Sequence, residues 1–369
     1  MVDENARRLV VLARKHFAEK RYDEALKCYD EALLIEPNYA EALCGKGEAL
    51  IASRRLDEAL EYFDRALKIN PMHAASWHGK GDAMRFKENY EEALVCLDKA
   101  LLLNPRDPQA WVCKGDTYKM MRLDTLAVPC YDMALLIDRK FVSALVSKGN
   151  SLDLMGKKEE ALKCFNKALS IDPENLDALE LKGRLLSNQG RYEEALECFE
   201  KILSSEPSKN SENYEDALRM KISLLEELGR YEEALRCCEE LMSLGKSCYG
   251  RMGNLLVKAG RYEEALESYS MDFFDPRDRN MVVMKGYALE QLGRYKEAVE
   301  CYNEYIKFDQ HAEEVWMGRA RALEQLGRYE EAIKSYNRVL SINPNRKEAQ
   351  ENKSKLLTKL EDTKKRKRA

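Results

Sequence analysis

Apolar residues recur along the chain at helical spacing, in pairs of short stripes separated by polar residues. In residues 74–107, the first stripe holds Trp77, Gly81 and Met84 at positions i, i+4 and i+7, which form one face of a helix. After three polar residues a second stripe follows at the same spacing: Ala93, Leu97 and Ala100. Asn104-Pro105 then interrupts the pattern, because proline disfavours helix in the residue before it. The segment therefore predicts two helices joined by a short turn.

The same helix hairpin is predicted ten times. Its clearest marker is the sequence GRYEEAL, which begins at 190, 229 and 260 and has looser copies elsewhere. One alanine in each copy marks the period: Ala25, Ala59, Ala93, Ala127, Ala161, Ala195, Ala234, Ala265, Ala298 and Ala332. The first five intervals are 34 residues long, and the next four are 39, 31, 33 and 34. A fixed period of this length is typical of a solenoid, whose repeats bury their core against their neighbours.

Small residues stand where the two helices of each hairpin are expected to meet. The first helix carries glycine at Gly47, Gly81, Gly115, Gly149, Gly183, Gly253 and Gly286. The second helix carries the alanine already described and, in units one to five, a second one at Ala32, Ala66, Ala100, Ala134 and Ala168. Such residues let two helix backbones approach closely.

This pattern resembles the tetratricopeptide repeat family over residues 6–346. Besides the small residues, the resemblance rests on the tryptophans Trp77, Trp111 and Trp316 and on the prolines that end six units. It implies an all-α fold: a right-handed α-α superhelical solenoid of ten helix hairpins, followed by a C-terminal capping helix.

The intervals of 39 and 31 residues predict an irregular joint at about residues 206–280. We therefore expect an N-terminal array of units one to six over residues 1–209 and a C-terminal array of units seven to ten over residues 210–346. Residues 347–369 would form the capping helix and a basic tail.

Charge and hydropathy argue against nucleic-acid and membrane classes. The net charge is −4, and the tail segment 364–368 contributes +5, so residues 1–363 carry −9. An acidic array disfavours a phosphate-binding groove along the body. No apolar run approaches the roughly 18 residues that a membrane span needs, and the first residues lack an apolar signal core. We expect a cytoplasmic protein.

The sequence offers no catalytic constellation. The four histidines, His16, His73, His78 and His311, fall in separate units. Paired glutamates such as Glu193-Glu194 begin second helices, where negative charge is favourable. We expect no enzyme activity, no cofactor and no metal site.

The eleven cysteines are predicted to be free thiols. Seven of them stand three residues after the alanine of their unit, so equivalent thiols lie one repeat apart. That separation is about 10 Å between stacked helices, more than a disulfide can bridge.

A lysine precedes the glycine in most first helices: Lys46, Lys80, Lys114, Lys148, Lys182, Lys221 and Lys285. We interpret this series as a solvated face, with its field partly cancelled by Glu48, Asp82 and Asp116.

The resemblance implies a partner protein, bound in the concave groove that the first helices line. One subclass of the family clamps the C-terminal carboxylate of chaperones with lysine, asparagine and arginine on successive first helices. Only Asn150 matches that pattern here, and Leu181 stands where the next asparagine is needed. We therefore do not expect a chaperone C-terminal carboxylate as the ligand.

We place the candidate site on the first helices of units three to five. Its residues are His78, Asp82, Arg85, Phe86, Val112, Asp116, Lys119, Met120, Val146, Asn150, Asp153 and Leu154. Phe86, Met120 and Leu154 occupy the same place in successive units and would form an apolar ladder along the groove. The alternative is that these side chains only shield the seam between inner helices.

A second function remains open at this stage. The basic tail at 364–368 would suit a helical repeat protein associated with nucleic acid, although it is one short run without interleaved aromatic residues. The sequence identifies neither the partner nor the oligomeric state.

Overall fold

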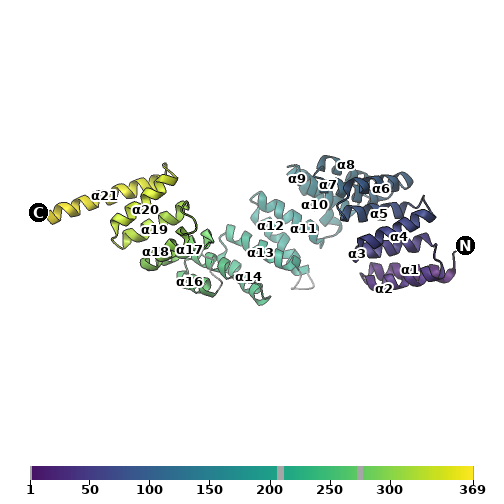
Figure 1. Cartoon of the computed structure of the whole chain (residues 1–369), viewed down its shortest axis with the longest axis horizontal. Helices are drawn as coiled ribbons and strands as arrows, with labels where there is room; N and C mark the ends of the chain where they lie inside the picture. Colours follow the sequence, from purple (N-terminus) through teal and green to yellow (C-terminus); the bar gives the residue numbers. More distant parts are fainter. Residues whose placement is uncertain (1, 206–211, 272–276, 369) are drawn as a thin grey trace. The chain divides into compact units, whose positions relative to one another are not determined.

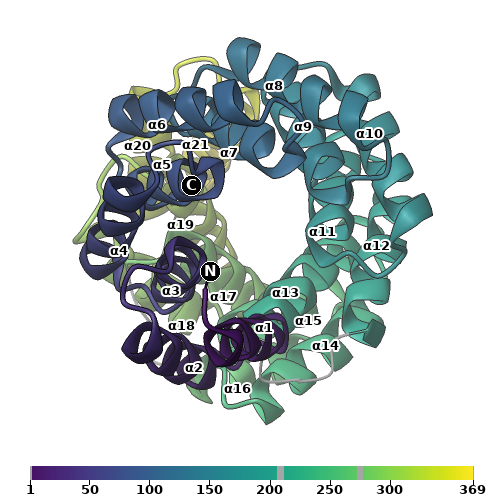
Figure 2. The same cartoon turned by 90° about the vertical axis from the view of Figure 1, so that its right-hand side faces the viewer.

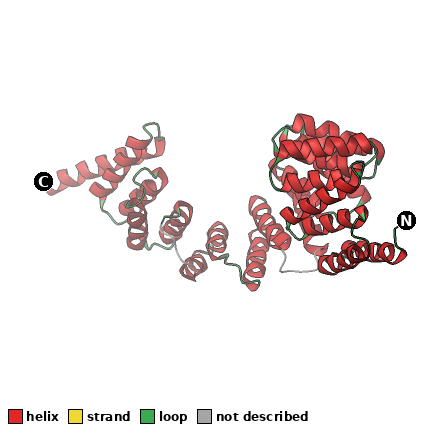
Figure 3. Ribbon diagram, turned by 45° about the vertical axis from the view of Figure 1, so that its right-hand side comes forward, coloured by secondary structure: helices red, strands yellow, loops and turns green. Residues whose placement is uncertain are grey.

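The computed structural model describes residues 2–205, 212–271 and 277–368. In these ranges the chain forms twenty-one α-helices and no strand, with short loops between the helices (Figures 1 and 3). The first twenty helices follow one another in the order that ten hairpins predict, and the last follows them as a single helix. The predicted all-α repeat fold is confirmed.

The chain divides into two compact units, Met1–Asn188 and Gln189–Ala369. The boundary falls between the two helices of the sixth repeat. The predicted division at 209/210 stays a prediction. Residues 206–211 and 272–276, which hold the polar insertion and the end of repeat eight, lie outside the described residues.

The first unit contains eleven helices in regular succession. Their bounds are α1 Glu4–Ala18, α2 Tyr22–Ile35, α3 Ala40–Ala52, α4 Leu56–Ile69, α5 Ala74–Phe86, α6 Tyr90–Leu103, α7 Pro108–Met120, α8 Asp124–Ile137, α9 Val142–Leu154, α10 Lys158–Ile171 and α11 Leu176–Asn188. Figure 2 shows this unit as a curve, with the odd-numbered helices on its inner side and the even-numbered helices on its outer side.

The second unit contains the other ten helices. Their bounds are α12 Tyr192–Ser205, α13 Glu212–Glu227, α14 Tyr231–Ser243, α15 Tyr249–Lys258, α16 Tyr262–Met271, α17 Arg279–Gln291, α18 Tyr295–Ile306, α19 Glu313–Gln325, α20 Tyr329–Ile342 and α21 Lys347–Arg368. Helix α21 packs on α20 through Ala349 and Leu356, which are 0% and 1% exposed. It thus covers the end of the array, as a solenoid requires, although Leu357 is 43% exposed.

The hairpin core is built from the predicted small residues and one large side chain. All ten marker alanines are 0% exposed. Most first-helix glycines face an aromatic ring on the second helix of the same hairpin. A Cβ atom on Gly115 would lie 2.5 Å from Cε1 of Tyr131, and one on Gly149 would lie 2.6 Å from Cε1 of Phe165. The glycine is required because the ring occupies the place of its side chain.

The three tryptophans tie first helices to the loops before them. The indole N–H of Trp77 donates to the Pro71 carbonyl at 2.9 Å, and that of Trp111 donates to the Pro105 carbonyl at 3.0 Å. Trp316 makes the same bond to Gln310 at 2.9 Å. This bond gives the indole N–H a hydrogen-bond partner in place of the water that it loses when the ring packs against the protein.

The interpretation of the lysine series as a solvated face is wrong for four of its lysines in the first unit. The side chains of Lys46, Lys80, Lys114 and Lys148 are only 12%, 20%, 17% and 22% exposed. Each pairs with an aspartate on the second helix of the preceding hairpin, for example Lys114 with Asp98 at 2.6 Å. The ion pairs therefore join neighbouring repeats, and the lysines offer little charge to a ligand.

The turn inside each hairpin requires a residue in the left-handed conformation. Later repeats place glycine there, such as Gly156 with φ of +78°. The first four repeats use other residues at the same place, with φ between 58° and 63°: Lys20, Arg54, Glu88 and Arg122. These four side chains carry a conformational cost of about 1 kcal/mol each.

We expect Glu88→Gly to stabilise the first unit by about 0.5–1 kcal/mol, because glycine removes the left-handed strain. Urea unfolding measures the change. Glu88→Ala is the matched control: it removes the charge but keeps the Cβ atom, and it should give no such gain. Equal gains in both variants would contradict the backbone explanation.

All eleven cysteines are free thiols, as predicted. Burial raises the pKa of several, including Cys130 to about 11, so these thiols stay protonated and react slowly in the folded protein. We expect alkylation without reductant to label all eleven once the chain is unfolded. A reproducible intramolecular disulfide in the mass spectrum would contradict this.

Candidate functional site

The twelve predicted site residues lie on three consecutive inner helices of the first unit. Helix α5 carries His78, Asp82, Arg85 and Phe86; α7 carries Val112, Asp116, Lys119 and Met120; α9 carries Val146, Asn150, Asp153 and Leu154. Helix α7 contacts both α5 and α9, and all three lie on the inner side of the curve in Figure 2. The structure therefore brings the three sets onto one face.

The apolar ladder of Phe86, Met120 and Leu154 is exposed. These side chains are 52%, 53% and 60% accessible, and each is the last residue of its helix. The guanidinium of Arg85 lies 4.3 Å from the centre of the Phe86 ring, a cation–π contact that orients the ring. The ladder is not part of the hairpin core.

Two of the predicted contact residues are buried behind this face. Val112 is 1% exposed and belongs to a buried cluster with Tyr131 and Ala144, and Val146 is 9% exposed. They support the wall of the site and offer almost no area to a partner. Their burial could not be predicted from the repeat alone, because the equivalent residue one repeat earlier, His78, is only half-buried.

Acidic and basic side chains on α5 and α7 are paired within each helix. Arg85 lies 2.5 Å from Asp82, and Lys119 lies 3.6 Å from Asp116. The same carboxylates also accept hydrogen bonds from side chains on other helices. Cys113 Sγ lies 3.3 Å from Asp82 Oδ1, and the Tyr131 hydroxyl donates to Asp116 at 2.8 Å.

Burial keeps the two donors, Cys113 and Tyr131, protonated. Burial, and then the charge of Asp82, raise the pKa of Cys113 well above its usual value. Burial and the charge of Asp116 raise the pKa of Tyr131 in the same way. Both groups therefore stay neutral and donate to the two carboxylates.

His78 links α5 to the start of α7. Its Nδ1 lies 3.7 Å from Oδ2 of Asp107, the N-cap residue of α7. Oδ1 of Asp107 accepts the backbone N–H groups of Gln109 and Ala110 at 3.0 and 3.2 Å. His78 is therefore part of the connection between two repeats as well as of the exposed face.

The charge pattern changes at α9. Asn150 stands where α7 has Asp116, and Asp153 stands where α7 has Lys119. A cavity of about 260 Å³ opens beside Asn150, between α7, α9 and α11. Its lining residues are Lys119, Val146, Ser147, Asn150, Asp177, Glu180 and Leu181.

Sequence reasoning missed the part of this site that α11 supplies. Glu180 stands 34 residues after Val146, so extending the inner positions by one repeat would have found it. Glu180 pairs with Arg184 at 2.8 Å, and Asp177 adds a further carboxylate. The α9–α11 end of the face is thus more acidic than the α5–α7 end.

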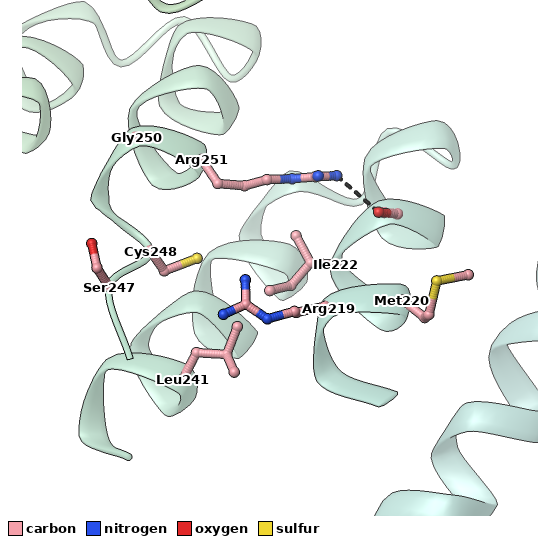
Figure 4. A pocket seen from close by; sticks show the side chains of 9 residues that line it. Arg219, Met220, Ile222, Leu241, Ser247, Cys248, Gly250 and Arg251 are labelled. Carbon is pink, nitrogen blue, oxygen red and sulfur yellow. Dashed lines mark hydrogen bonds between the residues drawn. The ribbon is translucent and has the colours of Figure 1, made fainter. Parts of the chain in front are cut away.

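The second unit has a cavity of about 320 Å³ between α13, α14 and α15 (Figure 4). Met220, Ile222, Leu241 and Cys248 are among the side chains that line it. Its two arginines are paired within the chain. Arg219 binds Glu215 at 2.8 Å, and Arg251 binds Ser223 at 3.0 Å and also Glu226. The cavity therefore presents little uncompensated positive charge to an anion.

No group of three or more histidine, cysteine, aspartate or glutamate side chains in the described ranges has the arrangement of a metal site. Among the helices described here, none is both long enough and apolar enough to cross a membrane.

Comparison with family models identifies the family of this chain. Four models described as tetratricopeptide repeat match the chain, at residues 186–241, 251–313 and 283–347, at 16–80 and 50–112, at 142–175, and at 164–197. The chain belongs to the tetratricopeptide repeat family. The expectation from sequence is confirmed, and the inner face described above is the inner face of a tetratricopeptide array.

One solved structure shows the same fold at low identity. PilW, described as a widely conserved type IV pilus biogenesis factor, is 23% identical over 58% of this tetratricopeptide chain and 99% of its own, with a TM-score of 0.52. Pseudomonas aeruginosa pilF is 19% identical over 58% and 96%, with a TM-score of 0.48. A thermophilic tetratricopeptide protein of Thermus thermophilus is 23% identical over 49% and 98%, with a TM-score of 0.45. A comparison with curated proteins found no match.

Proposed function

We propose that this protein is a non-enzymatic scaffold that binds a segment of a partner protein along α5, α7, α9 and α11. The observation that carries the proposal is the exposed ladder of Phe86, Met120 and Leu154. Three large apolar side chains recur one repeat apart on the inner face, and the hairpin core does not use them. Exposed apolar groups rimmed by polar residues are typical of a protein interaction site.

The ladder has definite ends, which supports a site of limited length. One repeat before Phe86 the position is Ala52, and one repeat after Leu154 it is Asn188. Neither offers a large apolar surface. The site therefore covers three repeats of the first unit, with an acidic extension toward α11.

The spacing of the ladder suggests the form of the bound segment. Neighbouring repeats stack about 10 Å apart. In an extended peptide that distance separates every third residue, and in an α-helix every seventh. We infer that the segment presents apolar side chains at one of these two spacings.

The charges on the inner face disfavour a carboxylate as the main ligand. Asp82 and Asp116 occupy positions at which a carboxylate clamp requires asparagine, and Asp177 adds negative charge beyond Asn150. Like charges at close range cost several kcal/mol in a complex. A partner segment with a basic residue near the α9–α11 end fits this field better.

Capture from a lysate of the source cells tests the proposed function. The full chain and a chain ending at residue 361 serve as baits, with nuclease treatment of half of each sample. Both baits are expected to retain the same partner protein after nuclease treatment. The alternative predicts bound nucleic acid that is lost with residues 362–369 and declines steeply with salt. That result would replace the scaffold proposal.

A further inference from the structure

Two cysteine thiols meet at the junction between the seventh and the eighth hairpin, inside the second unit. Cys238 lies on α14 and is 0% exposed, and Cys248 is the N-cap residue of α15 and is 7% exposed. A hydrogen bond joins the two side chains. The pair is therefore a contact between neighbouring hairpins, unlike the cysteines that recur one repeat apart.

Cys238 occupies a position that holds a large side chain in the other nine hairpins. The equivalent residues are Tyr29, Phe63, Leu97, Tyr131, Phe165, Phe199, Tyr269, Tyr302 and Tyr336. This position also faces the first helix of the next hairpin, as the ring of Phe63 does against Gly79. The seventh hairpin has Ile222 in place of the glycine of its own first helix. It has thus exchanged a ring and a glycine for a thiol and an isoleucine, and the thiol faces α15.

The cavity between α13, α14 and α15 gives a small reagent access to Cys248. Its volume is about 320 Å³, and Figure 4 shows the Cys248 thiol pointing into it from the start of α15. A water molecule has a share of about 30 Å³ in the liquid, so hydrogen peroxide fits easily. Cys238 is not among the residues that line this cavity. A peroxide that enters it therefore meets Cys248 first.

The surroundings give the two thiols different roles. The hydrogen bond to Cys248, and then burial, raise the pKa of Cys238 well above its usual value. Cys238 therefore keeps its proton and donates to the sulfur of Cys248. Cys248 also stands at the N-terminus of α15, the positive end of the helix dipole. A donated hydrogen bond and a helix N-terminus both favour a thiolate, the form of cysteine that attacks a peroxide.

We propose that Cys238 and Cys248 are an oxidation site, at which hydrogen peroxide produces a disulfide that joins the seventh hairpin to the eighth. The Cys248 thiolate attacks one oxygen of the peroxide, the O–O bond breaks, and a sulfenic acid and a hydroxide ion form. The sulfur of Cys238 then attacks the sulfenic sulfur, and its proton leaves with the hydroxyl group as water. The hydroxide takes up the proton that Cys248 released. The two sulfurs thus lose two electrons, and one peroxide becomes two water molecules.

The bond would strengthen one junction of the array. The loop between the two cysteines contains Gly245, whose φ of +75° only glycine adopts without strain. In a solenoid the coupling between neighbouring repeats contributes directly to stability. Closing a loop of about ten residues should raise the midpoint of thermal unfolding of the second unit by roughly 5–10 °C.

Peroxide oxidation of the full chain, followed by alkylation in denaturant and mass spectrometry, tests the proposal. Without peroxide all eleven thiols should be labelled. After a small excess of hydrogen peroxide two labels should be lost, and dithiothreitol should restore them. Trypsin cleaves after Arg236, Lys246 and Arg251, so the disulfide should join peptide 237–246 to peptide 247–251. The thermal midpoint should rise on oxidation and return on reduction.

Three variants assign the reaction to this pair. Cys248→Ser keeps a favourable N-cap residue, so it should fold, and after peroxide all its remaining thiols should still be labelled. Cys238→Ala should leave the sulfenic acid on Cys248, where dimedone traps it. Cys237→Ser is the matched control, because Cys237 adjoins Cys238 in the same tryptic peptide and is also buried. It should form the disulfide as the wild type does.

Far-UV circular dichroism confirms the folding of each variant before oxidation. A wild-type chain that keeps all eleven labels after peroxide would overturn the proposal. Two lost labels in Cys248→Ser, or a disulfide that Cys237→Ser abolishes, would also overturn it, because either result assigns the bond to other cysteines.

Discussion

Gly115→Ala should lower the free energy of unfolding of the first unit by about 1–3 kcal/mol, the usual cost of overpacking a core. The added Cβ atom would lie 2.5 Å from Cε1 and 2.9 Å from Cδ1 of Tyr131. Neither ring nor helix can yield easily, because Tyr131 is 0% exposed and its hydroxyl is bound to Asp116. Urea unfolding monitored by circular dichroism measures the loss.

A second substitution separates this steric mechanism from a general effect of the mutation. In the preceding repeat, Leu97 occupies the place of Tyr131. Tyr131→Leu on the Gly115→Ala background should therefore cost less than Tyr131→Leu on the wild type, since the smaller side chain relieves the clash. Additive losses in this double-mutant cycle would contradict a direct contact between the two residues.

Phe86→Ala combined with Met120→Ala should weaken partner capture by about 1–3 kcal/mol, or roughly 5- to 150-fold in Kd. Phe86 and Met120 are 52% and 53% exposed, so their truncation removes little from the core. The midpoint of thermal unfolding should change by only a few degrees. Titration of the captured partner against both proteins measures the first effect, and thermal unfolding measures the second.

The matched control is Leu34→Ala with Met72→Ala. These side chains are 82% and 70% exposed and lie outside the inner helices, so the control removes similar apolar groups elsewhere. It should leave capture unchanged. If the ladder variant instead lost stability and kept its partner, Phe86 and Met120 would belong to the core and the site would lie elsewhere.

The hairpins could be predicted from sequence because their period is strict. Ala93 and Ala127 recur 34 residues apart, and no helix can place a larger residue where two backbones meet so closely. The glycines followed from the same reasoning, although the ring that excludes their side chain is visible only in the structure. The same packing requirement applies at the same position of every repeat, so the sequence signal for the fold is strong.

The lysine series could not be interpreted from one repeat alone. Lys114 forms an ion pair with Asp98, which lies sixteen residues earlier on the preceding hairpin. From sequence, its charge was expected to be balanced by Asp116 instead. The pairing depends on how two hairpins stack. The burial of Val112 has the same origin, since the position faces a neighbouring repeat rather than open solvent.

The candidate site was predicted in outline. The equivalence of Phe86, Met120 and Leu154 followed from the period, and their exposure is now a structural fact. The α11 residues were missed because the prediction stopped at unit five.

Site-specific photo-crosslinking tests whether the inner face of the first unit binds a partner protein. A benzophenone amino acid replaces Met120 on the inner face or, as a control, the exposed Glu61 on the outer face of α4. We expect the probe at 120 to crosslink a partner protein in lysate and excess wild-type chain to compete this product away. The probe at 61 should yield none of it. A partner that crosslinks from position 61 and not from position 120 would contradict the account.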